Sequence, residues 1–122
     1  MPKLRQSSEK RQHPRVNKSL PIKINNQEFD IVTETKNISC VGAYCQVDKY
    51  VAPFTKIKTT VIIPAKKKCA NSLINCEGTV VRVEKIDNAL EQQYNIAIYF
   101  NQISKTNISK IDRFVKQYLS CA

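Results

Sequence analysis

The chain has 122 residues and a formal net charge of +10, with 20 lysines and arginines against 10 aspartates and glutamates. This length fits one domain with a single core, and so large an excess of positive charge indicates an anionic partner. The chain has no run of about 18 apolar residues and its N-terminus is polar, so the sequence predicts a cytoplasmic protein without an integral membrane segment.

The cysteines and the carboxylates show no pattern that is typical of a catalytic or metal site. Five cysteines accompany one histidine, His13, and none forms a C-x-x-C pair. An odd number argues against a secreted disulfide framework, and the spacing argues against zinc. We expect reduced, mostly buried cysteines, with a reactive thiol at Cys121 as the alternative. Since the carboxylates lack motif spacing, we expect no enzyme, metal or cofactor.

Residues 1–18 form a basic N-terminal arm. The arm carries six of the lysines and arginines and a single acidic residue, Glu9, so half of the net charge lies in it. It has too few apolar residues to fold by its own burial. We therefore expect a flexible arm that becomes ordered around an anion, followed by one folded domain over residues 19–122.

The segments that follow the arm are typical of strands. Apolar and polar or β-branched residues alternate over residues 20–24, 29–35, 43–47, 56–63, 76–86 and 94–100. Asn25 to Gln27 predicts a hairpin turn between the first two, and Gly42 marks a positive φ or a close backbone approach before the third. Residues 65–72, with three consecutive lysines at 66–68, are predicted to be an exposed loop.

The last segment changes period. Ile108, Ile111, Val115 and Tyr118 recur at helical spacing with charged residues between them, which predicts an amphipathic helix of about four turns that packs across an open end of the sheet. Short strands followed by one helix predict a mainly β domain with a C-terminal α-helix. Periodicity alone leaves a barrel and a sandwich both open.

Two short patterns predict the site. Arg11 and Arg15 form R-x-x-x-R, and Asn37, Ser39 and Gly42 form N-x-S-x-x-G on what we predict to be a separate turn. Two guanidinium groups chelate phosphate or the O6/N7 edge of guanine. The amide and the hydroxyl supply small polar contacts, and the glycine leaves room for a ligand to approach the backbone.

This pair of motifs, ahead of a β-rich segment, resembles the PilZ family of bacterial cyclic di-GMP receptors. The resemblance implies a small six- or seven-stranded antiparallel β-barrel with a C-terminal helix. It also implies a ligand site made by Arg11, Arg15, Asn37, Ser39 and Gly42. The resemblance further implies that a basic residue at Lys10, which precedes the first arginine, favours an intercalated pair of nucleotides over a single one.

Two positions depart from the pattern that is common in the family. An amide stands at Asn37 where many members have aspartate, so we expect weaker recognition of guanine there, and Ala97 stands where members often have a glycine. The resemblance implies a receptor whose arm changes conformation on binding. It would regulate a partner protein in motility, pilus, biofilm or virulence pathways.

Two other functions remain open. A small basic barrel could bind single-stranded nucleic acid through the arm, the lysines at 66–68 and the rings of Tyr44, Tyr50 or Phe54. We consider nucleic acid a weaker alternative, because no strand combines basic and aromatic residues. The chain could also be a protein adaptor that needs no ligand.

Overall fold

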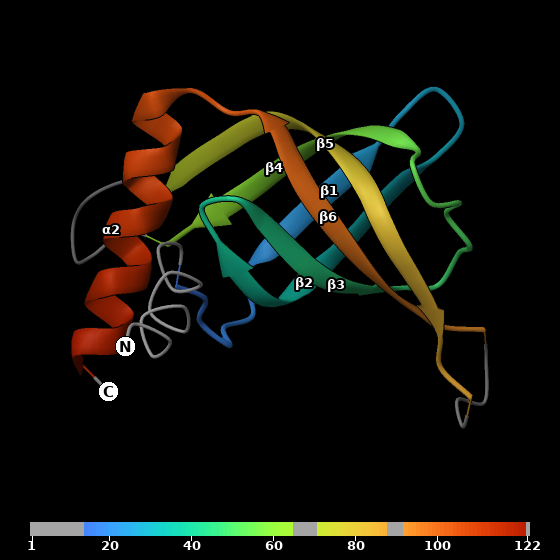
Figure 1. Ribbon diagram of the computed structural model, residues 1–122, viewed down its shortest axis with the longest axis horizontal. Helices are drawn as coiled ribbons and strands as arrows, with labels where there is room; N and C mark the ends of the chain where they lie inside the picture. Colours follow the sequence, from blue (N-terminus) through green and yellow to red (C-terminus); the bar gives the residue numbers. More distant parts are fainter. Residues whose placement is uncertain (1–13, 65–70, 88–91, 122) are drawn as a thin grey trace, which may run out of the picture.

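Within the residues that it describes, the computed structural model contains six strands and one helix (Figure 1). It describes residues 14–64, 71–87 and 92–121, with side chains up to residue 118. The elements are β1 Pro21–Asn25, β2 Asp30–Ser39, β3 Gly42–Val47, β4 Lys56–Ile63, β5 Ser72–Lys85, β6 Tyr94–Gln102 and α2 Lys105–Cys121. Each predicted strand segment overlaps one of these strands, and the predicted helix overlaps α2. Strand β5 begins at Ser72, four residues before its predicted start and at the end of the predicted loop.

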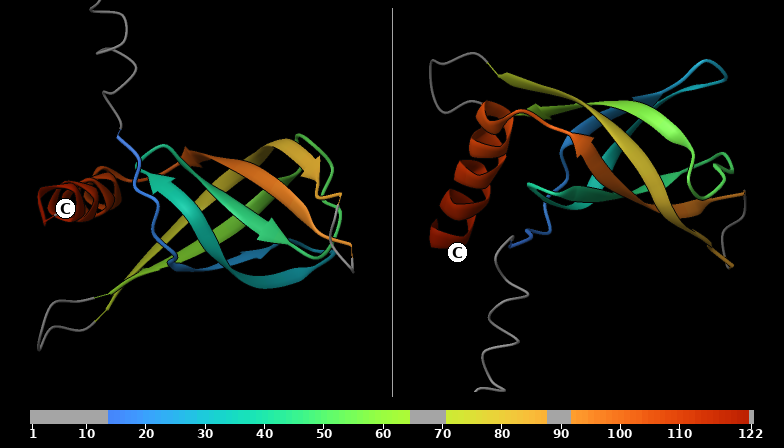
Figure 2. Two further views of the ribbon diagram at one scale, coloured as in Figure 1. Left: turned by 90° about the horizontal axis from the view of Figure 1, so that it is seen from below. Right: turned by 45° about the horizontal axis from the view of Figure 1, so that its top comes forward.

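The strands close into a barrel in the order β1-β2-β3-β6-β5-β4, and β4 pairs with β1 to complete it (Figure 2). All neighbouring strands are antiparallel. Closure leaves no free sheet edge along the paired parts of the strands. The structure therefore confirms the barrel and excludes the sandwich that periodicity alone allowed.

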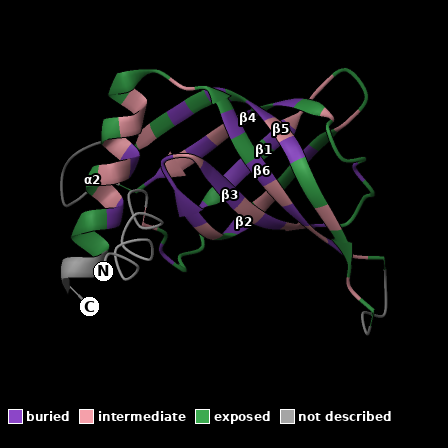
Figure 3. Cartoon of the chain, in the orientation of Figure 1, coloured by how far each residue is buried: buried purple, intermediate pink, exposed green. Residues whose placement is uncertain are grey.

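Alternation along each strand builds the core (Figure 3). Ile22 and Ile24 in β1 and Ile96 in β6 are fully buried, while their neighbours Lys23 and Asn95 are exposed or half-buried. Burying one aliphatic side chain of this size contributes roughly 1.5–3 kcal/mol. The outward residues of the same strands are thereby free to form a site.

Helix α2 lies at one end of the barrel, as Figures 1 and 2 show. Ser104 caps it by accepting a hydrogen bond from the amide of Asn107 at 3.1 Å. Ile111 and Val115 are fully buried, so the apolar stripe of the helix joins the barrel core. The predicted packing of this helix across an open end is confirmed.

The hairpin between β2 and β3 corrects one prediction. Asn37 and Ser39 were expected on a turn, but both belong to β2, and only Cys40 and Val41 separate Ser39 from Gly42. Asn37 and Ser39 suggest a turn in the sequence because they are polar and interrupt the alternation of apolar residues. In the structure β2 continues through them with a register shift between Thr35 and Asn37.

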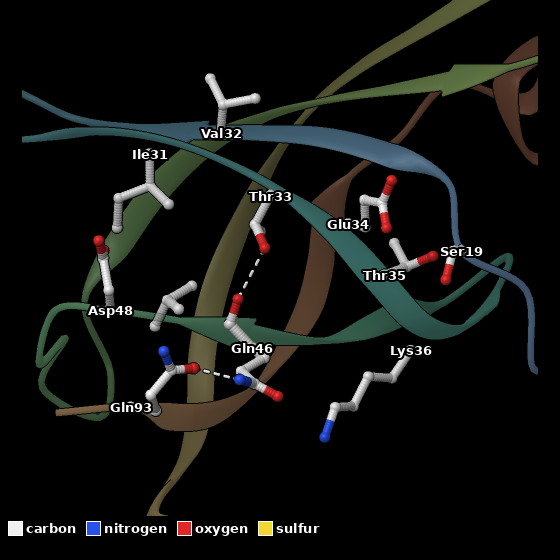
Figure 4. A pocket seen from close by; sticks show the side chains of 11 residues that line it. Ser19, Ile31, Val32, Thr33, Glu34, Thr35, Lys36, Gln46, Asp48 and Gln93 are labelled. Atoms are coloured by element: carbon white, nitrogen blue, oxygen red, sulfur yellow. Dashed lines mark hydrogen bonds between the residues drawn. The ribbon is translucent and has the colours of Figure 1, made fainter. Parts of the chain in front are cut away.

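The seam between β2 and β3 opens at its other end (Figure 4). The paired residues end at Thr35 and Cys45. Beyond them, the hydroxyl of Thr33 donates a 2.7 Å hydrogen bond to the backbone carbonyl of Gln46, and the side-chain Nε2 of Gln46 donates to the side-chain oxygen of Gln93. Side chains thus bridge the strands where the backbone ladder stops.

Candidate functional site

The end of the arm is fixed to the barrel next to the second motif. Val16 and Ile38 exchange two backbone hydrogen bonds of 3.1 Å each, and both side chains are buried. Lys18, further along, lies with its Nζ 5.7 Å from the ring centroid of Tyr118 on α2. These contacts fix the position of Arg15 relative to β2.

Arg15 and Asn37 meet directly, although 22 residues separate them in the chain. Nη1 of Arg15 donates a hydrogen bond of 2.8 Å to Oδ1 of Asn37. Arg15 is exposed and Asn37 is half-buried, so both remain open to a ligand. One residue of each sequence motif is therefore in contact with the other motif.

Ser39 and Gly42 have structural partners of their own. The hydroxyl of Ser39 is fully buried and accepts a hydrogen bond of 3.2 Å from the amide of Val41, which closes the hairpin turn. A Cβ on Gly42 would lie 2.3 Å from the carbonyl oxygen of Ile98, and the φ of Gly42 is not positive. Of the two predicted reasons for this glycine, the close backbone approach is the one observed.

A hollow of about 380 Å³ lies beside the Arg15–Asn37 contact. Its lining comes from the arm, from β2, β3, β5 and β6, and from the turn between β2 and β3. It consists of Arg15, Asn37, Val41, Ala43, Tyr44, Val81, Arg82, Ala97, Ile98 and Tyr99. Tyr44 and Arg82 both pair with Ala97, so the three residues form a row across the sheet with the smallest in the middle. The hollow exists because the alanine methyl leaves space between longer side chains. Its size falls within the range of about 300–1,000 Å³ that is typical of small-molecule sites.

Sequence reasoning did not assign Arg82 or Tyr99 to the site. Arg82 supplies a second guanidinium group to the lining, and Tyr99 supplies an aromatic ring that is 52% exposed. Both reach the hollow through the pairing of β6 with β3 and β5. The signal in the sequence was an aromatic residue, Tyr99, at an outward position of an alternating strand.

Tyr44 is held in place by Glu84. The hydroxyl of Tyr44 donates a hydrogen bond of 2.7 Å to Oε1 of Glu84, and Oε2 of the same carboxylate lies 3.4 Å from Nη1 of Arg82. The hydrogen bond to Glu84 is the main reason why the pKa of Tyr44 is raised above its ordinary value of 10.0, with burial adding to it. Tyr44 therefore stays protonated at neutral pH.

The charge of the lining distinguishes this hollow from two others on the barrel. The hollow in Figure 4, of about 420 Å³ at the open β2–β3 seam, sets Lys36 against Glu34 and Asp48. A third, of about 660 Å³, has two lysines and two glutamates in its lining. Among the described residues, the lining at Arg15 has two arginines and no carboxylate. An anion is therefore favoured in the hollow at Arg15 over either of these two hollows.

Other predicted features lie elsewhere or outside the described residues. Arg11, Lys10, His13 and the lysines at 66–68 fall outside the part of the chain that the structure describes, as does the side chain of Cys121. Tyr50 packs edge-on against Tyr94 at a centroid distance of 5.6 Å, and Phe54 is 77% exposed in a turn where its φ is 71°.

The described residues contain no group of three or more His, Cys, Asp or Glu side chains that could hold a metal ion. Burial raises the pKa of the Cys45 thiol to about 12, and it also raises the pKa of Cys40 and Cys76. Within the same described part, no helix is long and apolar enough to cross a membrane.

The barrel and its hollow define a small binding domain, and comparison with known sequences gives its family. The model of the PilZ domain matches residues 9–117, and the chain belongs to the PilZ family. PilZ domains are binding domains and not enzymes. No curated protein matches the chain at a significant level.

Solved structures share the fold. The Bacillus subtilis inhibitor of motility MotI/DgrA superposes with a TM-score of 0.77 and 18% identity over 90% of this chain and 52% of its own. The PilZ domain of Escherichia coli YcgR, solved with c-di-GMP, gives 0.64 and 10% identity over 90% of this chain and 92% of its own. Borreliella burgdorferi PlzA, also in complex with c-di-GMP, superposes with a TM-score of 0.61 and 10% identity, over 98% of this chain and 57% of its own. The chain spans about half the length of MotI.

Proposed function

We propose that this protein is a cyclic di-GMP receptor whose site is the hollow at Arg15 and Asn37. The observation that carries the proposal is the 2.8 Å hydrogen bond between these residues, which joins the two motifs at one positively charged cavity. Membership of the PilZ family and the two c-di-GMP complexes among the similar structures support the choice of ligand.

The chemistry of the hollow suits this ligand. Cyclic di-GMP carries two phosphates and two guanines, and arginine binds either group through paired N–H donors. The hollow presents Arg15 and Arg82 together with the exposed ring of Tyr99, against which a purine can stack. Asn37 offers an amide oxygen to a guanine N–H group, and Arg11 and Lys10 would add charge from the arm.

In this proposal the arm is the part that responds to the ligand. Residues 1–18 carry Lys10, Arg11 and Arg15, whereas the barrel over residues 19–122 carries the other proposed contacts. A ligand that contacts both parts favours the arrangement in which the arm lies against the barrel. It can shift this equilibrium only by the difference between its affinities for the protein with the arm against the barrel and with the arm away from it. The altered surface then regulates a partner protein without catalysis.

The proposal extends to the pathway in which the receptor acts. MotI is described as an inhibitor of motility, which supports a partner in motility, with pilus, biofilm and virulence systems as related choices. We propose that such a receptor works in the cytoplasm. A pull-down from a bacterial lysate with and without cyclic di-GMP would identify a partner whose capture depends on the nucleotide.

Calorimetric titration of the full chain tests the proposal. We expect saturable binding of cyclic di-GMP, weaker binding of GMP, and at least tenfold loss of affinity in Arg15→Ala. Arg113→Ala is the matched control, because Arg113 is an exposed arginine on α2 outside the lining of the hollow. Ser39→Ala is expected to weaken binding by loosening the turn after β2, and its thermal unfolding would report that loss.

The control and the nucleotide series also separate the alternatives. Equal loss of affinity in Arg15→Ala and Arg113→Ala would indicate general electrostatic attraction. A steep salt dependence with single-stranded RNA, and no discrimination between cyclic di-GMP and GMP, would favour nucleic-acid binding. The absence of any heat or thermal shift with micromolar cyclic di-GMP would contradict the proposed function.

A further inference from the structure

A charged pair borders the hollow on β5. Arg82 and Glu84 project from the outer face of this strand, and their side chains approach within 3.4 Å. Glu84 also accepts the hydrogen bond from Tyr44 across β6, so one of its oxygens has a fixed position. A guanidinium donor and a carboxylate acceptor are therefore presented side by side, next to the cavity that Arg82 and Tyr44 line.

We propose that Arg82 and Glu84 read the guanine base, and that they make the site selective for guanine over adenine. The inference rests on the proposed function and names the residues that decide which purine is accepted. Neither residue belongs to the two sequence motifs.

The order of polar atoms along guanine matches the pair. N7 and O6 accept hydrogen bonds, and N1–H and the N2 amino group, which follow around the ring, donate them. Arg82 can donate to N7 and O6 while Glu84 accepts from N1–H and N2–H. Adenine presents an amino donor in place of O6 and a bare acceptor at N1. It would therefore set donor against donor at Arg82 and a lone pair against the carboxylate at Glu84.

Both side chains are available to a ligand. The side chain of Arg82 is 65% exposed and that of Glu84 is 46% exposed. An ion pair with this exposure contributes little to stability, so turning its groups toward a base costs little. The hydrogen bond from Tyr44 leaves further lone pairs on the carboxylate free to accept.

Glu84 also compensates for the amide at Asn37, where many PilZ proteins have an aspartate. An amide oxygen at position 37 is a neutral acceptor, and its contact with Arg15 already uses one lone pair. Charge-assisted hydrogen bonds are roughly twice as strong as neutral ones. The carboxylate that the second motif lacks is thus supplied by another strand at the border of the same hollow.

Titrations of the full chain with cyclic di-GMP and cyclic di-AMP test the inference. We expect wild type to prefer the guanine nucleotide, and Glu84→Gln to lower that preference at least tenfold. Arg82→Gln is the second variant and should act in the same direction. Glu77→Gln is the matched control, since Glu77 is an exposed glutamate on the same strand, outside this lining, and the change in charge is identical.

The outcomes distinguish this inference from the function on which it rests. If wild type binds neither nucleotide, both fail. If wild type binds cyclic di-GMP and Arg15→Ala abolishes binding, but both β5 variants discriminate the purines as wild type does, the receptor function stands and the guanine-reading pair is wrong. A preference lowered equally in Glu77→Gln would also overturn it, because the effect would then come from net charge.

Discussion

Arg15 and Asn37 are joined by a 2.8 Å hydrogen bond between Nη1 and Oδ1, at the point where the arm meets β2. The backbone bonds between Val16 and Ile38 place the two side chains next to each other. Arg15 of the arm motif and Asn37 of the barrel motif are thus parts of one surface.

Replacing Asn37 tests this contact. Asn37→Leu removes the acceptor for Arg15 and for a guanine N–H, and a hydrogen bond to a charged group is worth about 1.5–3 kcal/mol. We expect a loss of cyclic di-GMP affinity of about tenfold or more by calorimetry. Asn75→Leu, at an exposed site on β5 outside this lining, is the control. Unchanged affinity in Asn37→Leu would remove Asn37 from the site.

Ala97 tests the hollow without altering charge. Leucine at this position would place three more carbons between Tyr44 and Arg82, where the cavity now lies. Because Ala97 faces outward and is half-buried, Ala97→Leu should keep the barrel folded while it blocks the ligand. We expect an unfolding midpoint close to that of wild type and loss of detectable binding. Full binding by a folded Ala97→Leu variant would show that the nucleotide lies elsewhere.

Gly42 is expected to matter for stability through packing. A Cβ at this position meets the Ile98 carbonyl oxygen at 2.3 Å, whereas a Cβ on Gly78 meets the Cγ2 methyl group of Ile98 at 2.9 Å and the carbonyl oxygen of Tyr99 at 3.2 Å. Overpacking typically costs about 1–3 kcal/mol. Urea unfolding should show Gly42→Ala to be less stable than Gly78→Ala, because its Cβ would come closer to strand backbone, at 2.3 Å instead of 3.2 Å. The reverse order would contradict this reading.

Val16 fixes the arm by burial as well as by hydrogen bonds. Its side chain is 2% exposed, and Val16→Ala removes two carbons at about 0.8 kcal/mol each. We expect residues 14–18 to be cleaved faster by limited proteolysis and cyclic di-GMP to bind more weakly, although Val16 does not line the hollow. Val115→Ala, at a fully buried site on α2, controls for general destabilisation. Equal effects of the two variants on affinity would argue against a specific role for the arm.

Buried thiols predict a decrease of stability in alkali. The folded pKa of Cys45 is raised from 9.0 to about 12 by burial, so the unfolded chain releases this proton at lower pH than the native protein does. This contribution is fully present below pH 9, and it is lost between pH 9 and pH 12 at up to about 1.4 kcal/mol per unit. The free energy of unfolding should therefore fall less steeply in Cys45→Ala than in wild type. Parallel curves would show that Cys45 does not contribute.

The sequence predicted the strands and helix well because each buries one face of a regular element. Ile22 and Ile24 alternate with polar neighbours, and Ile111 and Val115 follow a helical spacing. Closure through the pairing of β1 with β4 is a long-range contact that periodicity does not encode. The barrel was expected only from the resemblance to a family, and the structure confirms it.

The sequence was less informative about the site. It singled out Arg15 and Asn37 through their motifs, but it placed Asn37 and Ser39 on a turn because polar residues resemble loop chemistry. Arg82, Glu84 and Tyr99 remained unassigned, since charged and aromatic residues on outward strand positions are common. Their proximity to Asn37 depends on the strand order, in which β6 lies between β3 and β5, and only the assembled barrel shows this order.

The central claim is that the arm, the second motif and the β5–β6 surface form one cyclic di-GMP site. A titration followed by two-dimensional amide NMR tests it most directly. We predict that cyclic di-GMP shifts the amide signals of Arg15, Asn37, Arg82 and Tyr99 together, and leaves those of Asn26 and Lys58 in the third hollow unchanged. No shifts at saturating nucleotide, or shifts confined to the open seam around Thr33 and Gln93, would contradict the claim.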